Sequence, residues 1–462
     1  MTDKSTKANS QPKFTAKSKG KSKGKSKGKS TAKTDRPYDI VIAGAGYVGM
    51  CLAVSVKQAA PHLSVLVVDP APQGAFRNDP RASAIAAAAS RMLDTLGVWQ
   101  DLLSESQPIN EMVVTDSKLA DPVRPVFLTF GDAEADTPEP FAHMVPNAAL
   151  LTALHSRADD MSIDRMPRNV VADFERDGGL TTLTLHNVET GERSLQGARL
   201  LIACDGVRSK LRDLAGIRTV RVPYDQMGIV TTVAHERAHG GRAEEHFLPA
   251  GPFATLPLPP KDGKNRSSIV WTEATSDAQR LLAMDEFEFE LELEQRFGLQ
   301  LGDIALDGPR NAYPLGLTLA RDIVRDGFAL AGDAAHGIHP IAGQGLNLGF
   351  KDVAALAQTI VEADRLGLDF SSFTALERYQ SWRRFDTVQM GVTTDLLNRL
   401  FSNDNPALMA ARDFGLGIVD RLPRLKDAFI GQAAGNDLPG ILGRAQRHLL
   451  PEQPRLLVGQ EI

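Results

Sequence analysis

Three glycines near the start of the chain have the spacing of a phosphate-binding turn. Gly44, Gly46 and Gly49 form G-x-G-x-x-G between an apolar run of strand length and a stretch of helical length. In such a turn the first glycine permits the tight bend, the second lets the backbone approach a pyrophosphate, and the third lets helix and strand pack closely. Asp69 ends the next strand-like run, 20 residues after Gly49, where its carboxylate can accept hydrogen bonds from a ribose hydroxyl. These residues predict a dinucleotide site and leave NAD and FAD open.

A second segment far downstream decides between the two dinucleotides. Gly332 and Asp333 end another strand-like run, and a glycine-rich turn, 343–345, then opens a helix. A second phosphate loop is the competing interpretation, but no G-x-x-x-x-G-K-[ST] is present and no lysine follows the glycines until Lys351. A flavin explains the residues better: Asp333 could hold a ribityl hydroxyl, while the first turn of the helix offers unpaired amides to the ring edge that becomes negative on reduction. The segment therefore predicts FAD.

Residues 339–352, HPIAGQGLNLGFKD, resemble the H-P-x-x-G-Q-G-x-N-x-G-x-x-D segment of the ubiquinone-biosynthesis ring hydroxylases. These are single-component flavoprotein monooxygenases with the fold of p-hydroxybenzoate hydroxylase, and the resemblance extends from Tyr38 to about Gly435. It adds Arg81 and Asp205 to the cofactor contacts, and it identifies Pro340 as the flavin-adjacent residue and sole catalytic candidate. The predicted cofactor-binding set is Gly44, Gly46, Gly49, Asp69, Arg81, Asp205, Gly332, Asp333, Pro340, Gly343, Gln344, Gly345 and Asn347.

The resemblance also implies the chemistry. Reduced flavin would react with O₂ to give a C4a-hydroperoxide, which hydroxylates the ring of a prenylated phenol or quinone precursor in ubiquinone biosynthesis, with NAD(P)H as the electron donor. No metal is expected, because His336 and His339 supply only two nitrogens and no thiolate lies near them. Two alternatives stay open: a flavin-dependent reductase of prenyl double bonds, and a flavin-bearing scaffold of a biosynthetic complex without chemistry of its own.

The elements needed to position these residues predict an α/β protein: a Rossmann-like FAD-binding domain with an inserted, mainly β substrate domain and C-terminal helices. Alternating, β-rich stretches in 113–130 and 225–271 indicate the inserted domain, whereas 79–99, 345–363 and 373–400 read as helical. The expected FAD-binding parts are 37–110, 141–222 and 311–400; the substrate-domain parts are 111–140 and 223–310; a helical region follows at 401–462.

The charge is unevenly distributed along the chain. Residues 1–36 hold 11 Lys, one Arg and two Asp, so this segment carries +10, whereas the whole chain has a net charge of -5. Its KSKG repeats cannot form a core, which predicts a disordered tail. A solvated appendage is favoured over electrostatic contact with anionic lipid, and nucleic acid is not expected as a partner.

The sequence also bears on location. No apolar run reaches the roughly 20 residues that span a bilayer, and no apolar region follows the basic stretch as in a secretory signal. Both cysteines, Cys51 and Cys204, lie inside apolar segments, which fits buried thiols in a reducing compartment. A cytoplasmic protein is expected, and peripheral contact with the inner membrane or with a ubiquinone-biosynthesis complex stays open.

Overall fold

The computed structural model describes residues 32–33, 36–117, 119, 124–131, 140–338, 344–401 and 453–462. Its first layer is a nine-stranded sheet whose central strands are parallel. These strands are β3 (Val65–Asp69), β2 (Tyr38–Ala43), β12 (Arg193–Ala203) and β20 (Phe328–Leu330). Their buried residues form nearly continuous apolar runs, as expected for strands covered on both faces. The sheet is completed by β9 (Asp164–Pro167), β10 (Asn169–Asp177), β11 (Leu180–Asn187), β1 (Ala32–Lys33) and β19 (Val324–Arg325).

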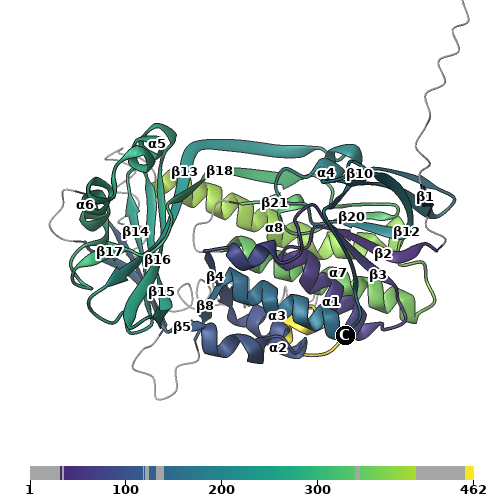
Figure 1. Ribbon diagram of the computed structural model, residues 1–462, viewed down its shortest axis with the longest axis horizontal. Helices are drawn as coiled ribbons and strands as arrows, with labels where there is room; N and C mark the ends of the chain where they lie inside the picture. Colours follow the sequence, from purple (N-terminus) through teal and green to yellow (C-terminus); the bar gives the residue numbers. More distant parts are fainter. Residues whose placement is uncertain are drawn as a thin grey trace, which may run out of the picture.

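Helices pack against this sheet. α1 (Tyr47–Ala59) connects β2 to β3, and it contacts both α3 (Asn147–Asp160) and α7 (Gln344–Arg365). Figure 1 shows α1, α3 and α7 gathered on one side of the first sheet, with α8 (Phe373–Phe401) extending from them toward the other half of the molecule. Among the helices of the described residues, none combines the length and the hydropathy needed to cross a bilayer.

A second nine-stranded sheet forms the other half. Two long strands, β13 (Thr219–His235) and β18 (Asn311–Ala320), pair with each other and bridge the two halves across the top of Figure 1. Residues 223 and 311, where domain boundaries were expected, lie inside β13 and at the start of β18. The remaining strands are β16 (Lys264–Ala274), β15 (Gly251–Lys261), β14 (Arg242–Leu248), β6 (Glu111–Asp116), β7 (Val126–Phe130), β17 (Ile304–Leu306) and β21 (His336–Gly337).

The two faces of the second sheet serve different purposes. One face packs against α5 (Thr275–Ala283) and α6 (Glu286–Phe297) through a core that includes Phe253 and Trp271. Because side chains alternate along a strand, their neighbours Ala254 and Val270 point to the opposite face, where they line a cavity. The predicted β-rich region is present, and the second face of its sheet lines the cavity.

The helix predicted over 79–99 is partly wrong. Residues 82–86 form strand β4 (Ala82–Ala86), and only then does α2 (Ala87–Thr95) begin. β4 pairs with β8 (Ala142–Pro146), which also pairs with β5 (Gln107–Ile109). The alanine-rich sequence has high helix propensity, but this pairing and a side-chain clamp from α7 determine the strand. The predicted end of the helix at Gly97 is confirmed by its left-handed conformation, φ 71°.

Both ends of the chain carry short described pieces. Ala32 and Lys33 pair in parallel with β12 inside the range expected to be disordered; residues 1–31 and 34–35 of that tail lie outside the described residues. At the other end, the short 3-10 helix Arg455–Val458 packs against α2 and α7, with Leu456 and Leu457 buried. Residues 402–452, most of the predicted C-terminal helical region, also lie outside the described residues.

Candidate functional site

The carboxyl ends of three parallel strands lie side by side at one edge of the first sheet. The Cys204 amide after β12 donates to the Ala43 carbonyl of β2 at 2.8 Å, and the Ala331 amide after β20 donates to the Ala203 carbonyl at 3.0 Å. The segments that follow these strands are the glycine-rich turn, residues 204–206 and the turn at Gly332. All three predicted segments therefore converge at the edge where ligands bind in open α/β sheets.

The three glycines of the first turn occupy different steric environments. Gly44 has φ +114°, and a Cβ there would lie 2.3 Å from the Cys204 carbonyl oxygen. A Cβ on Gly49 would lie 1.9 Å from the Gly44 carbonyl oxygen. Around Gly46, by contrast, a Cβ would meet no atom within 4 Å. Gly44 and Gly49 are thus required by the fold itself, whereas Gly46 leaves open space for a ligand.

A cavity of about 590 Å³ lies on one side of Gly46 and reaches Asp69 at the end of β3. The two carboxylate oxygens of Asp69 accept hydrogen bonds from the Ala45 and Ala71 amides, both at 2.7 Å. These bonds hold the carboxylate beside the turn. On the far side the cavity is lined by the stacked rings of Phe76 and His155, whose centroids are 4.4 Å apart.

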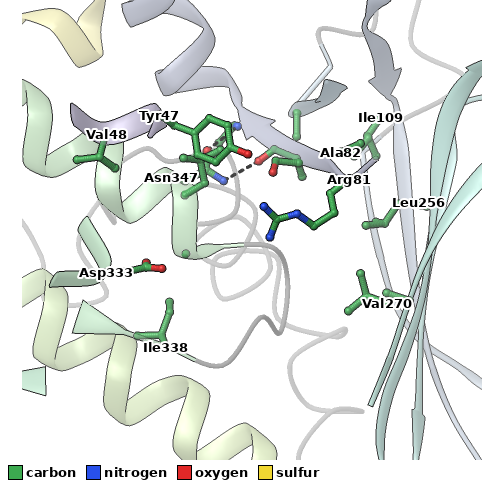
Figure 2. A pocket seen from close by; sticks show the side chains of 18 of the residues that line it. Tyr47, Val48, Arg81, Ala82, Ile109, Leu256, Val270, Asp333, Ile338 and Asn347 are labelled. Carbon is green, nitrogen blue, oxygen red and sulfur yellow. Dashed lines mark hydrogen bonds between the residues drawn. The ribbon is translucent and has the colours of Figure 1, made fainter. Parts of the chain in front are cut away.

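A second cavity of about 510 Å³ lies on the other side of Gly46, between the two halves of the molecule. Figure 2 shows Asp333 and Asn347 on one side of it, Leu256 and Val270 on the other, and Arg81 projecting between them. Because both cavities share Gly46, a single elongated ligand can cross the turn with one end in each. This arrangement fits FAD, with the ribose end near Asp69 and the ring end in the second cavity.

Asp333 supplies the exposed carboxylate of the second cavity. It belongs to the short 3-10 turn Gly332–Ala334, and its exposed side chain lines the cavity. Burial raises its pKa, and the nearby negative charge of Asp352 adds to the rise, against the opposing effects of His336 and Arg81. An acceptor held in this way can bind a ligand hydroxyl, which fits the predicted ribityl contact.

Asp333→Asn is expected to weaken FAD binding by about 10- to 100-fold, because a charge-assisted hydrogen bond is lost. The folded-state pKa lies above that of an unfolded aspartate, so the ionised carboxylate opposes folding of the apoprotein at neutral pH. The variant should therefore unfold at a slightly higher temperature without FAD. Flavin fluorescence titration and thermal unfolding measure both effects. Asp277→Asn, at an exposed aspartate on α5, is the control, and unchanged FAD affinity in Asp333→Asn would contradict the assignment.

The start of α7 borders the same cavity. Gly345 and Leu346 line it, and a Cβ on Gly345 would meet no atom within 4 Å. The backbone of Gln344 begins the helix, so the free amides of its first turn lie beside the cavity. Pro340 and Gly343, the remaining predicted residues of this segment, lie outside the described residues.

Arg81 is held in a polar cluster that the sequence only partly indicated. Its guanidinium makes two hydrogen bonds to Asp79, at 2.8 and 2.7 Å. The hydroxyl of Tyr47 donates to the same carboxylate at 3.0 Å, and the Asn147 amide lies 3.4 Å from it. Tyr47 lies inside the G-x-G-x-x-G motif, directly after Gly46, and this position is the one signal that could have indicated it. The cluster fixes a positive charge at the cavity.

Two predicted cofactor residues use their side chains for the protein itself. Asn347 donates to the Ala84 carbonyl and accepts from the Ala86 amide, both at 2.9 Å, so it clamps α7 to β4 while lining the cavity. Asp205 accepts from the Lys210 amide at 3.1 Å at the start of α4 (Lys210–Leu214). The structure therefore brings the neighbours of Asp205, and not its side chain, to the cavity.

A buried ionic network behind the Gly332 turn was missed by the sequence reasoning. Asp352, fully buried on α7, accepts from the Gly332 amide at 2.8 Å and lies 2.5 Å from His336 Nε2. Its other oxygen accepts from Arg383 Nε of α8 at 2.7 Å. Burial opposes ionisation of Asp352, but the charges and hydrogen bonds of His336 and Arg383 outweigh it and lower the pKa. The network fixes the turn that presents Asp333.

The fold of this chain is shared by solved flavin-dependent monooxygenases. One similar solved structure is p-nitrophenol 4-monooxygenase PnpA from Pseudomonas putida DLL-E4. It has a TM-score of 0.69 and 18% identity, and the match covers 87% of this chain and 98% of that one. Another is PqsL from Pseudomonas aeruginosa in complex with 2-aminobenzoylacetate, with TM-score 0.65, 20% identity and coverage of 79% and 97%. These likenesses confirm the predicted fold class.

Residues 37–375 match the family described as FAD binding domain, and the chain belongs to this family. It is 42% identical over 430 residues to ubiquinone hydroxylase UbiL of Rhodospirillum rubrum, covering 92% of this chain and 94% of the relative. It is 33% identical over 407 residues to 3-demethoxyubiquinol 3-hydroxylase of Escherichia coli, covering 87% and 100%. The predicted resemblance to ubiquinone-biosynthesis hydroxylases and the expectation of an FAD-dependent monooxygenase are thus confirmed.

Proposed function

We propose that this chain uses FAD, O₂ and electrons from NAD(P)H to hydroxylate the aromatic ring of a prenylated phenol or quinone precursor of ubiquinone. One observation carries the proposal: the second cavity has the predicted flavin-binding edge on one side and the largely apolar face of β15 and β16 on the other. An aromatic ring placed between them would lie against the cofactor. The relatives' names supply the substrate class.

The residues of the chain would act by binding, orientation and exclusion of water. Bound FAD supplies the redox chemistry, since reduced flavin activates O₂. Asp333 and the first turn of α7 would hold the cofactor. Arg81 would place a positive charge near the part of the flavin that becomes negative when the flavin is reduced. Leu256 and Val270 would bind the substrate ring and keep water out, which favours transfer of oxygen to carbon.

No described side chain needs to act as a nucleophile in this proposal. The thiol of Cys204 borders the cavity, but burial raises its pKa far above the usual range, with the charges of Asp205 and Asp352 adding to the shift. A thiol held in its neutral form is a poor nucleophile. Cys204, which is partly exposed rather than buried as expected, instead contributes a small apolar surface to the cavity.

Quinone intermediates from a strain lacking the gene test the function. The strain should accumulate a precursor one oxygen lighter than the next intermediate, and restoring the intact gene should remove it. Restoring a Leu256→Trp variant, which fills the substrate side of the cavity, should leave the precursor in place while FAD still binds. Accumulation of a species that differs by two hydrogens would favour reduction of prenyl double bonds instead.

The electron donor is tested with the purified holoenzyme under anaerobic conditions. Added NADH or NADPH should bleach the visible absorbance of the bound flavin, and the faster of the two identifies the donor. A flavin that neither nucleotide reduces, with or without the ring substrate, would contradict this part of the proposal and would favour a scaffold without its own chemistry.

A further inference from the structure

Helix α8 contacts segments on both sides of the second cavity through buried polar side chains. Near its start, the Tyr379 hydroxyl donates to the Leu330 carbonyl at 2.8 Å, just before the Gly332 turn. One helical turn later, Arg383 reaches that turn through Asp352, which accepts from the Gly332 amide. The first part of α8 is thus fixed to the flavin side of the cavity.

The far part of α8 is fixed to the substrate side. Asn398 Nδ2 donates to Gln226 Oε1 of β13 at 3.0 Å, and Gln226 Nε2 donates to the Ala250 carbonyl at 2.7 Å. Only 4% of Asn398 and 9% of Gln226 is exposed, so water cannot easily replace these bonds. Ala250 lies two residues before Pro252, which lines the cavity together with Ala254 and Leu256 of β15.

The turn held by this pair has little freedom of its own. Gly251 has φ +143°, and a Cβ there would lie 2.5 Å from the Thr272 methyl group. The Gly251 backbone therefore packs closely against β16. A shift of the Ala250 carbonyl would therefore move Pro252 and Thr272, which both line the cavity. Arg383 and Asn398 are 15 residues apart, which is about 22 Å of helix. Figure 1 shows α8 running beneath β13 and β18 between the two halves.

We propose that α8 is a strut that sets the distance between the flavin-side turn and the substrate-side wall, with Asn398 and Gln226 as positioning residues. The inference rests on the proposed function. In coupled turnover, substrate, O₂, NAD(P)H and a proton give hydroxylated product, water and NAD(P)⁺. When the ring is misplaced, O₂, NAD(P)H and a proton give hydrogen peroxide and NAD(P)⁺ without product. The strut favours the first outcome, because oxygen transfer depends on close approach.

The test compares Asn398→Leu, Gln226→Leu and the double variant with Thr394→Val. Thr394 is a matched control because it is equally buried on α8 and its hydroxyl bonds only within the helix. Each single Leu variant should lower product formed per NAD(P)H by about 5-fold or more, with a matching rise in peroxide. FAD affinity should stay within about 2-fold, since the flavin-side contacts are intact.

The double variant separates positioning from stability. Replacing both partners by apolar side chains should restore the part of the thermal stability that depends on the Asn398–Gln226 bond, while the loss at the Ala250 carbonyl remains. Product per NAD(P)H should nevertheless stay low, because the Ala250 carbonyl has still lost its donor. Recovery of coupling together with stability, or wild-type coupling in all variants, would overturn the strut.

Amide hydrogen exchange gives a readout that does not require turnover. The peptide 247–254 should exchange faster in Asn398→Leu and Gln226→Leu than in Thr394→Val. If the wild-type enzyme forms no hydroxylated product but exchange responds in this way, the proposed function fails and the strut stands. If product forms but exchange at 247–254 is unchanged in the Leu variants, the strut proposal is wrong and the proposed function stands.

Discussion

Gly49→Ala is expected to prevent folding, whereas Gly46→Ala is expected to give a folded protein that binds FAD poorly. The added methyl at position 49 would lie 1.9 Å from the Gly44 carbonyl oxygen, in a buried contact between backbone atoms that cannot move apart cheaply. At position 46 the methyl meets no atom within 4 Å in the protein, but it enters the space where the two cavities meet. Soluble yield, circular dichroism and FAD titration distinguish the two outcomes.

The expected loss of FAD affinity in Gly46→Ala is about 100-fold, because the methyl would push the pyrophosphate away from the turn amides. The control is Gly178→Ala, in a hairpin turn where a Cβ also meets no atom, and FAD affinity should be unaffected there. If Gly46→Ala bound FAD with wild-type affinity, the dinucleotide would have to bind away from this turn. A stable, FAD-binding Gly49→Ala protein would contradict the close packing of turn and helix.

Asp352→Asn is expected to lower the free energy of unfolding by about 3–5 kcal/mol, the typical cost of removing one partner of a buried ion pair. Arg383, with 3% of its side chain exposed, would keep only Asp386 as a charged partner, and the Gly332 amide would lose a charged acceptor. The Gly332 turn would then hold Asp333 less firmly, so FAD affinity should fall as well. Denaturant unfolding of the apoprotein and FAD titration measure the two losses.

Glu362→Gln is the matched control for this experiment. Glu362 and Arg378 form an ion pair that also joins α7 to α8, but 24% and 48% of their side chains are exposed. The expected cost is below about 1 kcal/mol, since exposed pairs contribute little. Equal losses of unfolding free energy in Asp352→Asn and Glu362→Gln would show that the buried network is not a principal support of the Gly332 turn.

The pH dependence of stability follows from the same carboxylate. The folded-state pKa of Asp352 lies below the value of about 3.9 for an unfolded aspartate. Its contribution is therefore fully present above that value and is lost as the pH falls through the lower, folded-state pKa. Wild-type stability should fall more steeply than that of Asp352→Asn below about pH 4. Parallel curves for the two proteins would contradict the ionised state of Asp352.

The cofactor edge could be predicted because its signals are local. Gly44, Gly46 and Asp69 belong to one strand-turn-helix-strand unit, in which Gly49 packs against the Gly44 carbonyl and Asp69 accepts from the Ala45 amide. The turn at Asp333 was likewise predictable from the strand and the glycines around it. The remainder of the site depends on residues that are remote in sequence, which a single sequence cannot bring together.

The errors and omissions have identifiable physical causes. Residues 82–86 form a strand because β8 pairs with them and Asn347, 261 residues from Ala86, clamps their backbone. Arg383 is one of several arginines in α8, and nothing in its local sequence distinguishes it from the exposed Arg384. The Asn398–Gln226 bond joins residues 172 positions apart. Such pairings are consequences of the fold and are visible only in three dimensions.

The measurement that tests the central claim most directly is isotope incorporation by the purified protein. The FAD-loaded enzyme would be given NAD(P)H, a prenylated phenol and ¹⁸O₂, and the product would be analysed by mass. We expect one ¹⁸O atom in the aromatic ring of the product and its loss when Leu256→Trp blocks the cavity. A product that gains hydrogens without ¹⁸O, or a reduced flavin that yields only peroxide with every ring substrate offered, would contradict the account.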